Sequence, residues 1–329
     1  MLVPVILFIL GLIALIKGGD WFVDGSTGIA HRFHVPEILI GATVVAIGTT
    51  LPEVMVSATS AVSGHGEIAY GNALGSIICN TALIAALTIA IKPSKVDRDT
   101  LKTPVIFFFI AAAVYAFTAY AIGSFSRFAG IILLAIFVVY MIYTVLQVKK
   151  LPPQPVKNPL SEFGEEEEKE EESPIIKDIL LLIVGAALIA VGANLLVDNG
   201  TIIAKYLGVP ESVIALTFVA LGTSLPELVT AITALAKGHG SLSLGNVIGA
   251  NLFNIVLVSG ISTVLAPFEI PQNKLIAGMN ASLVVDIPVM LLVMCLLTIP
   301  ALIREKLSRA QGISLLAIYA GFCIFQFVG

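Results

Sequence analysis

Charged residues are scarce in this sequence: Asp, Glu, Lys and Arg make up 12% of its 329 residues, whereas 57% are hydrophobic. Soluble domains carry about 25% charged residues, so the composition excludes an ordinary soluble fold, and we expect no nucleic-acid partner. Cysteine is also rare, and its three residues lie inside apolar segments, which argues against a disulfide framework or a metal cluster. The N-terminus lacks the basic leader and cleavage site of a secretory signal, so we expect it to form a retained membrane span.

Long apolar segments are what the sequence does contain. A helix needs about 20 apolar residues to cross the hydrocarbon core of a bilayer, and breaks at Gly, Pro and charge clusters divide the chain into ten such segments. We expect spans near residues 2–25, 37–63, 67–91, 104–122, 127–148, 176–199, 211–236, 241–266, 275–298 and 307–328. Five spans lie in residues 1–148 and five in 176–329, on either side of a proline-rich and then acidic linker, 149–175, which we expect to be disordered.

The distribution of Lys and Arg predicts the orientation, because both are enriched in cytoplasmic loops. With the N-terminus outside, fourteen of the 18 basic residues fall in inside loops and three in outside loops. We therefore predict that both termini lie outside and that the acidic linker is cytoplasmic. The sequence predicts an all-α integral membrane protein with ten transmembrane helices, a multi-pass protein of the plasma membrane.

An internal repeat relates the two halves. A shift of 174 residues aligns 11–91 with 185–265 without a gap, and sixteen of forty positions within 41–80 are identical. Because each half holds an odd number of spans, the halves enter the membrane from opposite sides. Inverted repeats of this kind are typical of transporters, whose substrate site lies near the bilayer midplane where the halves meet. A channel is the alternative for such a repeat.

Each half contains one glutamate directly after a proline, in the middle of an apolar segment. Glu53 follows Pro52 in "GTTLPE", and Glu227 follows Pro226 in "GTSLPE". A charge inside the membrane costs several kcal/mol and a proline inside a helix costs about 3 kcal/mol. A lone glutamate of this kind could be a protonated packing residue. The occurrence of two in the same context instead predicts a common function at the midplane.

The repeated motif places hard oxygen ligands together. Each proline leaves backbone carbonyls one turn earlier without a donor, and Thr49 and Glu53 are four residues apart on one helical face, as are Thr223 and Glu227. Carbonyl, hydroxyl and carboxylate oxygens suit Ca²⁺, Mg²⁺ or Na⁺ rather than soft metals. Two carboxylates also balance the charge of one divalent ion. The motif therefore predicts one cation site built from both halves.

The spans that follow the motifs supply further polar residues. Asn72, Ser76 and Asn80 form a stripe at spacing four in "GNALGSIICN", and Gly71 and Gly75 predict close approach of another helix. The corresponding positions in "GNVIGANLFN" are Asn246, Ala250 and Asn254. Asn80 and Asn254 lie deeper and are the stronger ligand candidates, while Asn72 and Asn246 serve equally well as residues that hold helices together.

Other charged residues have simpler interpretations. Lys17, Asp20 and Asp24 lie near the end of the first span, where snorkelling or local pairing is the expected role. His65 and His239 each lie between glycines in a turn, and the inverted topology puts them on opposite sides, so we expect loop roles rather than a metal pair. An intramembrane hydrolase with the two glutamates as an acid–base pair is a remote alternative, because no nucleophile–base pair is evident.

With these motifs, the chain resembles the sodium/calcium exchangers of the calcium/cation antiporter superfamily. The resemblance is carried by "GTTLPE", "GTSLPE", "GNALGSIICN" and "GNVIGANLFN". It implies a secondary active antiporter, not an enzyme, that extrudes Ca²⁺ in exchange for Na⁺, with no cofactor and no obligatory protein partner. It implies that Glu53 and Glu227 are the central ligands and that spans one and six form a long tilted pair that slides. It also implies that the shells are completed by the carbonyls of Ala46, Thr49, Ala220 and Thr223 and the hydroxyls of Thr50, Ser76 and Ser224.

Two positions depart from the family pattern. Position 250 is Ala where several relatives carry serine, and position 254 is Asn where many carry Asp. One half therefore lacks a hydroxyl, and the site holds two formal charges. These departures leave Ca²⁺/H⁺ antiport as the closest alternative, because burial favours the neutral form of a carboxyl group and lets it carry a proton.

Overall fold

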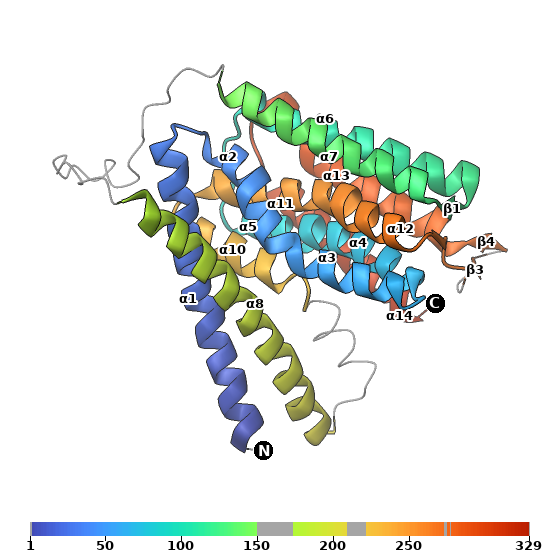
Figure 1. Cartoon of the computed structure of the whole chain (residues 1–329), viewed down its shortest axis with the longest axis horizontal. Helices are drawn as coiled ribbons and strands as arrows, with labels where there is room; N and C mark the ends of the chain where they lie inside the picture. Colours follow the sequence, from blue (N-terminus) through green and yellow to red (C-terminus); the bar gives the residue numbers. More distant parts are fainter. Residues whose placement is uncertain (1, 150–173, 209–221, 273–274, 277, 329) are drawn as a thin grey trace.

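The computed structural model describes residues 2–149, 174–208, 222–272, 275–276 and 278–328. Figure 1 shows a bundle of long helices. The α-helices are α1 (Leu2–Arg32), α2 (Glu37–Ile40), α3 (Ala46–Val62), α4 (Gly66–Cys79), α5 (Ala86–Ile91), α6 (Arg98–Phe117), α7 (Arg127–Val148), α8 (Ile175–Tyr206), α10 (Leu225–Ala236), α11 (Gly240–Phe253), α12 (Gly260–Leu265), α13 (Ile287–Arg304) and α14 (Arg309–Val328). Turns of π-helix continue five of the segments: η1 (Gly41–Val45), η2 (Asn80–Ala85), η3 (Thr118–Ile122), η6 (Asn254–Ser259) and η7 (Ser282–Asp286).

Eight continuous helical segments are long and apolar enough to cross a membrane, by length and composition. They are Leu2–Arg32, Glu37–Val62, Gly66–Ile91, Arg98–Ile122, Arg127–Val148, Ile175–Tyr206, Gly240–Leu265 and Ser282–Arg304. Each overlaps one of the expected spans. The expected span 211–236 is described only from residue 222, where α10 is a shorter apolar helix, and most of the linker 149–175 lies outside the described residues. The chain is therefore a helical membrane protein.

Two very short sheets depart from the all-α expectation. Strand β1 (Ser124–Phe125) pairs antiparallel with β2 (Phe268–Glu269), and β3 (Leu275–Ile276) pairs with β4 (Met279–Asn280). All four strands lie in connections between helices, where backbone N–H and C=O groups have no intrahelical partner and bond to one another instead. The sequence gave no signal for these strands, because a strand of two residues is too short to show an alternating pattern.

Helices α1 and α8 pack with their backbones in contact and cross the rest of the bundle as a pair (Figure 1). Gly11, Gly18 and Gly25 are spaced by seven along α1, and Gly185 and Gly192 have the same spacing in α8. A Cβ atom on Gly18 would lie 2.9 Å from the carbonyl oxygen of Gly185. Small residues let membrane helices approach this closely, so the glycines fix α1 and α8 to each other.

The most buried of the eight segments are Gly240–Leu265 and Gly66–Ile91, which carry the two asparagine motifs. Their surroundings differ at the glycines. A Cβ on Gly245 would lie 2.2 Å from the backbone of Ile38, whereas no described atom lies within 4 Å of a Cβ on Gly71 or Gly75. The close helix approach expected at Gly71 and Gly75 is therefore present at their repeat counterparts, and it is not seen at these two glycines in the part of the chain that the structure describes.

We predict that Gly185→Ala destabilises the protein, because its Cβ would lie 2.5 Å from the amide nitrogen of Phe22 and would separate α1 from α8. Overpacking of this kind costs about 1–3 kcal/mol, measured as the free energy of unfolding in detergent. Gly321→Ala in α14 is the matched control, since a Cβ there meets no described atom within 4 Å. Equal stability of the two variants would contradict the account of the α1–α8 contact.

Candidate ion-binding site

The two motif glutamates lie at the centre of the helix bundle. Helices α3 and α10 contact each other and both pack against α11, and they carry Glu53 and Glu227 with no solvent exposure. All four carboxylate oxygens are without a hydrogen-bond partner among the described residues. The carboxylates are also close enough to repel each other when both are charged. A buried, unpaired charge is costly, so the two carboxyl groups need either protons or a bound cation to neutralise them.

Further polar atoms in the two motifs, and in the helices that follow them, are buried in the same way. The hydroxyls of Thr50 and Ser224 and the amide groups of Asn80 and Asn254 have no partner within the described ranges. Their residues are at most 2% exposed. The 174-residue shift relates each pair, so the two halves offer matching sets of hard oxygen ligands. Of the other expected ligands, Ser76 is buried on α4, and Ala220 lies outside the described residues.

Hydrogen bonds join the halves beside the carboxylates, and they also obey the repeat. The Thr49 hydroxyl donates to Oδ1 of Asn246 over 3.1 Å, and the Thr223 hydroxyl donates to Oδ1 of Asn72 over 3.4 Å. Asn72 in turn donates to the Ser57 hydroxyl and to the carbonyl of Glu53. Asn72 and Asn246 thus hold helices of opposite halves together, as the packing interpretation predicts.

The two prolines occupy different local structures. Pro52 lies inside α3, which continues to Val62, and its missing N–H leaves the carbonyl of Gly48 without the usual helical donor. Pro226 lies in the first turn of α10, where no donor is needed. The carbonyl of Ala46, another expected ligand in the first half, accepts a hydrogen bond of 3.4 Å from the Thr49 hydroxyl. The expected proline break is therefore a helix start in the second half and a single missing bond in the first.

Turns of π-helix begin at both deep asparagines. Segment η2 starts at Asn80 and η6 starts at Asn254, and both are six residues long. A π-turn widens the helix and is frequent at functional sites, because it redirects a side chain from the regular face. The sequence carries no signal for these turns, since the residues that form them are mostly apolar.

Sequence reasoning missed two buried polar residues close to the motifs. The Thr230 hydroxyl, one turn after Glu227, has no partner among the described residues. Asn251 donates to the hydroxyl of Thr81 over 2.7 Å and to the sulfur of Met294 over 3.2 Å. Its repeat counterpart is Ile77, so a search for repeated residues passes over it. Its place within "GNVIGANLFN" was the available signal.

The remaining charged candidates form pairs away from the glutamates. Lys237, which directly follows α10, lies 2.7 Å from Asp24 and 3.6 Å from Asp20, so these aspartates pair with the second half of the chain rather than locally. His65 and His239 each directly precede a helix, and His239 pairs with Glu37 at 2.8 Å. In the ranges that the structure describes, no group of three or more His, Cys, Asp or Glu is arranged to hold a metal ion.

Comparisons with known proteins identify relatives of the whole chain. The family profile described as "Sodium/calcium exchanger protein" matches residues 3–146 and 177–328. The chain is 32% identical to the sodium/calcium exchanger MaX1 of Methanosarcina acetivorans over 98% of both chains. It is 36% identical to the inner membrane protein YrbG of Escherichia coli over 82% of both. The structure of the sodium-calcium exchanger NCX_Mj soaked with Na⁺ and Sr²⁺ is similar, with a TM-score of 0.78, 34% identity and 97% coverage of both chains.

We predict that Ca²⁺ stabilises the wild-type protein but not the Glu53→Gln or Glu227→Gln variants, because one carboxylate cannot neutralise a divalent ion. At a Ca²⁺ concentration one hundred times the dissociation constant, binding adds about 2.7 kcal/mol to the free energy of unfolding. Thermal unfolding with and without Ca²⁺ measures this gain. Asp198→Asn, which removes an exposed acid on α8, should keep the full gain. An undiminished gain in either glutamine variant would disprove the shared site.

Proposed function

The chain belongs to the sodium/calcium exchanger family, and we propose that it extrudes Ca²⁺ in exchange for Na⁺ by alternating access. The observation that carries this proposal is the pair of buried carboxylates, Glu53 and Glu227, which come from opposite halves and have no partner among the described residues. Two negative charges match one Ca²⁺ ion. No covalent step is involved, since the substrates are the ions themselves.

The proposed ligands divide between the two ions. Ca²⁺ is held by the carboxylates of Glu53 and Glu227 and the carbonyls of Thr49 and Thr223. Na⁺ ions use the same carboxylates with the flanking oxygens of Ala46, Thr50, Ser76, Asn80, Ala220, Ser224 and Asn254. Because both kinds of ion need the carboxylates, they exclude each other. Mutual exclusion at one site couples the exit of one ion to the entry of the other.

Contacts between loops support the proposed ten-span topology, with inverted units at 1–148 and 176–329. Arg32, after the first span, pairs with Asp178 at the start of α8, and Glu37 pairs with His239 between the seventh and eighth spans. A backbone bridge joins Lys95 to Lys306. The ten-span assignment puts all of these positions on one side. It puts β1 and β2, which also pair, together on the other.

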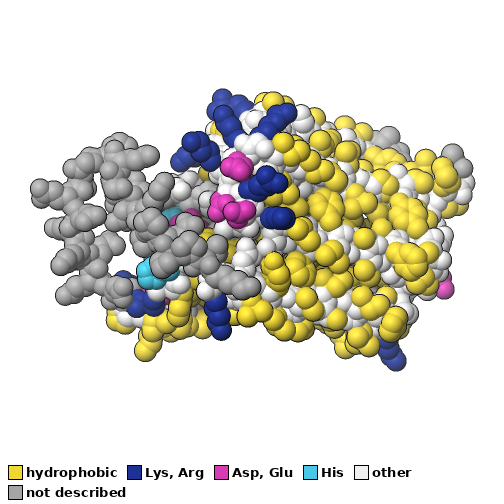
Figure 2. All heavy atoms as spheres, turned by 90° about the horizontal axis from the view of Figure 1, so that it is seen from above, with side chains coloured by type: hydrophobic (Ala, Val, Ile, Leu, Met, Phe, Trp, Pro, Cys, Tyr) yellow, Lys and Arg dark blue, Asp and Glu magenta, His cyan; other side chains and the backbone are white. Residues whose placement is uncertain are grey.

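The distribution of charge supports the proposed orientation. Figure 2 shows most of the visible Lys and Arg side chains at one end of the molecule, while hydrophobic side chains cover most of the remaining surface. Basic residues favour the cytoplasmic side of a membrane. We therefore place this end and the linker 149–175 in the cytoplasm, and both termini outside the plasma membrane.

Alternating access is assigned to α1 and α8. Their glycine contacts make them one rigid body, and their spans are among the least buried of the eight. A pair that moves against the bundle exposes the site to one side and then to the other. The paired halves keep the carboxylates in place during this movement.

One observation favours the alternative of Ca²⁺/H⁺ antiport. Ala250 replaces the hydroxyl that its counterpart Ser76 supplies, so the second half is poorer in Na⁺ ligands. A proton binds directly to one of the buried carboxyl groups and needs no further oxygen ligands around it.

The transport experiment separates these two functions. Vesicles with the purified protein and internal Na⁺ should take up ⁴⁵Ca²⁺ when diluted into Na⁺-free medium, because outward Na⁺ flow drives inward Ca²⁺ flow. Empty vesicles and vesicles loaded with K⁺ are the controls. Uptake that follows an imposed pH gradient and ignores Na⁺ would establish proton coupling in place of Na⁺ coupling.

A second prediction uses the asymmetry between the halves. Ala250→Ser restores a hard ligand without a change in charge, so we expect a several-fold higher apparent Na⁺ affinity with little change in Ca²⁺ affinity. Asn254→Asp adds a third carboxylate among the buried oxygens and should make transport more dependent on pH. Exchange rates measured across Na⁺ concentration and pH check both. If neither variant alters either profile, positions 250 and 254 do not line the ion path.

A further inference from the structure

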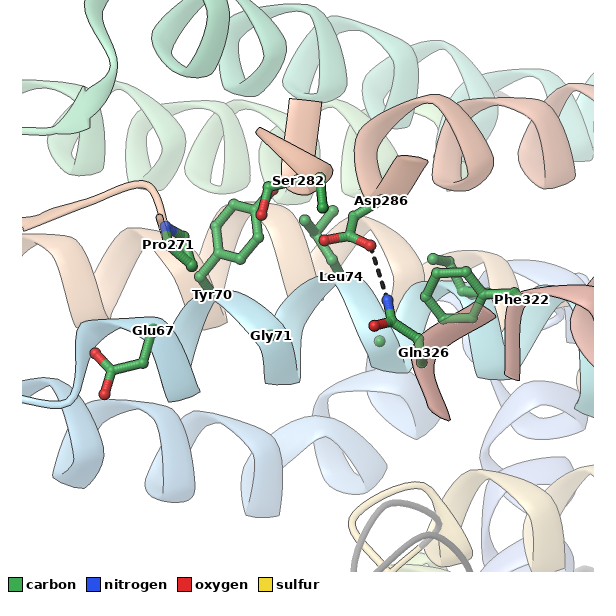
Figure 3. A pocket seen from close by; sticks show the side chains of 12 residues that line it. Glu67, Tyr70, Gly71, Leu74, Pro271, Ser282, Asp286, Phe322 and Gln326 are labelled. Atoms are coloured by element: carbon green, nitrogen blue, oxygen red, sulfur yellow. Dashed lines mark hydrogen bonds between the residues drawn. The ribbon is translucent and has the colours of Figure 1, made fainter. Parts of the chain in front are cut away.

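A pocket of about 400 Å³ lies beside α4, along a face adjacent to the one that carries Asn72 and Ser76. Figure 3 shows it between α4, the π-turn η7 and α14. Residues that line it include Tyr70, Leu74, Gly75, Ser282, Asp286 and Gln326. One wall of it is the motif helix α4, and the other walls come from segments outside the matched repeat, including η7 and α14.

The charge in this pocket is negative. Asp286 lies at the start of an apolar span and accepts a hydrogen bond of 2.9 Å from Nε2 of Gln326 (Figure 3). Glu67 lies at the end of the pocket, with its carboxylate turned away from Asp286 and toward His65. None of the described lining residues is basic. A carboxylate within a membrane span is costly unless it serves an ion or proton path.

A buried hydroxyl provides an independent sign of a ligand. Tyr70 lines the pocket and is 2% exposed, and its hydroxyl has no hydrogen-bond partner among the described residues. Figure 3 shows its ring pointing toward Ser282, at the same edge of the pocket as Asp286. A buried polar group without a partner costs free energy, so a group that enters the pocket must satisfy it.

The size of the pocket indicates the form of the ligand. A water molecule takes about 30 Å³ of liquid volume, so the pocket accommodates a small ion together with several waters. A Cβ atom on Gly71 or Gly75 would meet no described atom within 4 Å, so bare backbone faces open space on this side of α4. One carboxylate, two hydroxyls and an amide oxygen are hard ligands, but they are too few to strip Ca²⁺ of its water.

We propose that this pocket is a second cation site, which holds a largely hydrated Ca²⁺ ion through Asp286, Tyr70, Ser282 and Gln326. With one formal charge at the ion, its affinity is millimolar, in the range of weak extracellular Ca²⁺ modules at about 10⁻⁴–10⁻³ M. Its role rests on the proposed function and orientation: the pocket opens on the outer side, and Ile78 at its lining is two residues from Asn80. The site concentrates Ca²⁺ beside the transport site.

Terbium luminescence tests the site without transport. Tb³⁺ replaces Ca²⁺ and emits when a nearby tyrosine is excited, and Tyr70 lies in the pocket. The protein carries Glu53→Gln and Glu227→Gln so that the transport site is removed. The acidic linker binds Tb³⁺ without this signal, because residues 149–175 contain no Tyr or Trp. We expect sensitised emission that millimolar Ca²⁺ suppresses.

The variants decide the outcome. Asp286→Asn should weaken Tb³⁺ binding at least tenfold, although it keeps an oxygen that accepts from Gln326. Asp286→Glu should largely retain binding. Glu269→Gln, which removes an exposed acid on β2, should have no effect. If the double glutamine variant does not fold, the same titration is made on the wild-type background with the transport site saturated by Ca²⁺. Emission that survives Asp286→Asn, or no Ca²⁺-sensitive emission, overturns the proposal. Absence of Na⁺-driven exchange would refute the proposed function and leave this binding result unaffected.

Discussion

The main physical constraint on this molecule is the burial of two carboxylates in one helix bundle. Glu53 and Glu227 lie at the centre of the bundle without a described partner, and the helices around them are held in place by other groups. A protein that only needed stability would replace both with apolar residues. In the proposed function this cost is recovered when a cation binds, so affinity for the ion is linked to the stability of the centre. The proposal then favours replacement of one ion by another, because it avoids the bare pair of charges.

The internal repeat gives the two halves matching parts around this pair. Each half supplies one carboxylate, one asparagine that begins a π-turn and one threonine that donates across to the other half. The hydrogen bonds of Thr49 to Asn246 and of Thr223 to Asn72 are related by the same shift as the sequence. The halves differ at Ser76 and Ala250, and at Ile77 and Asn251, so the ligand sets that flank the carboxylates are unequal.

Much of this could be predicted from the residues, because the costs of burying charge and proline are general and their repetition removes coincidence. The burial of both glutamates, eight of the ten expected membrane spans and the family followed from that reasoning. The π-turns at Asn80 and Asn254 could not, since apolar residues form α- and π-turns alike. The contrast between Gly71 and Gly245 depends on which helix lies opposite, and spacing alone does not tell this. Asp286 was missed because it belongs to no repeated motif and its importance comes from the pocket around it.

The central claim is that one Ca²⁺ ion is held by both halves at once. Anomalous diffraction from crystals grown with Ca²⁺, collected at a wavelength where calcium scatters anomalously, locates the ion directly. The account predicts a strong peak that lies about 2.3–2.6 Å from oxygens of both Glu53 and Glu227. A peak bound to one glutamate alone, or no peak between α3 and α10, would contradict it.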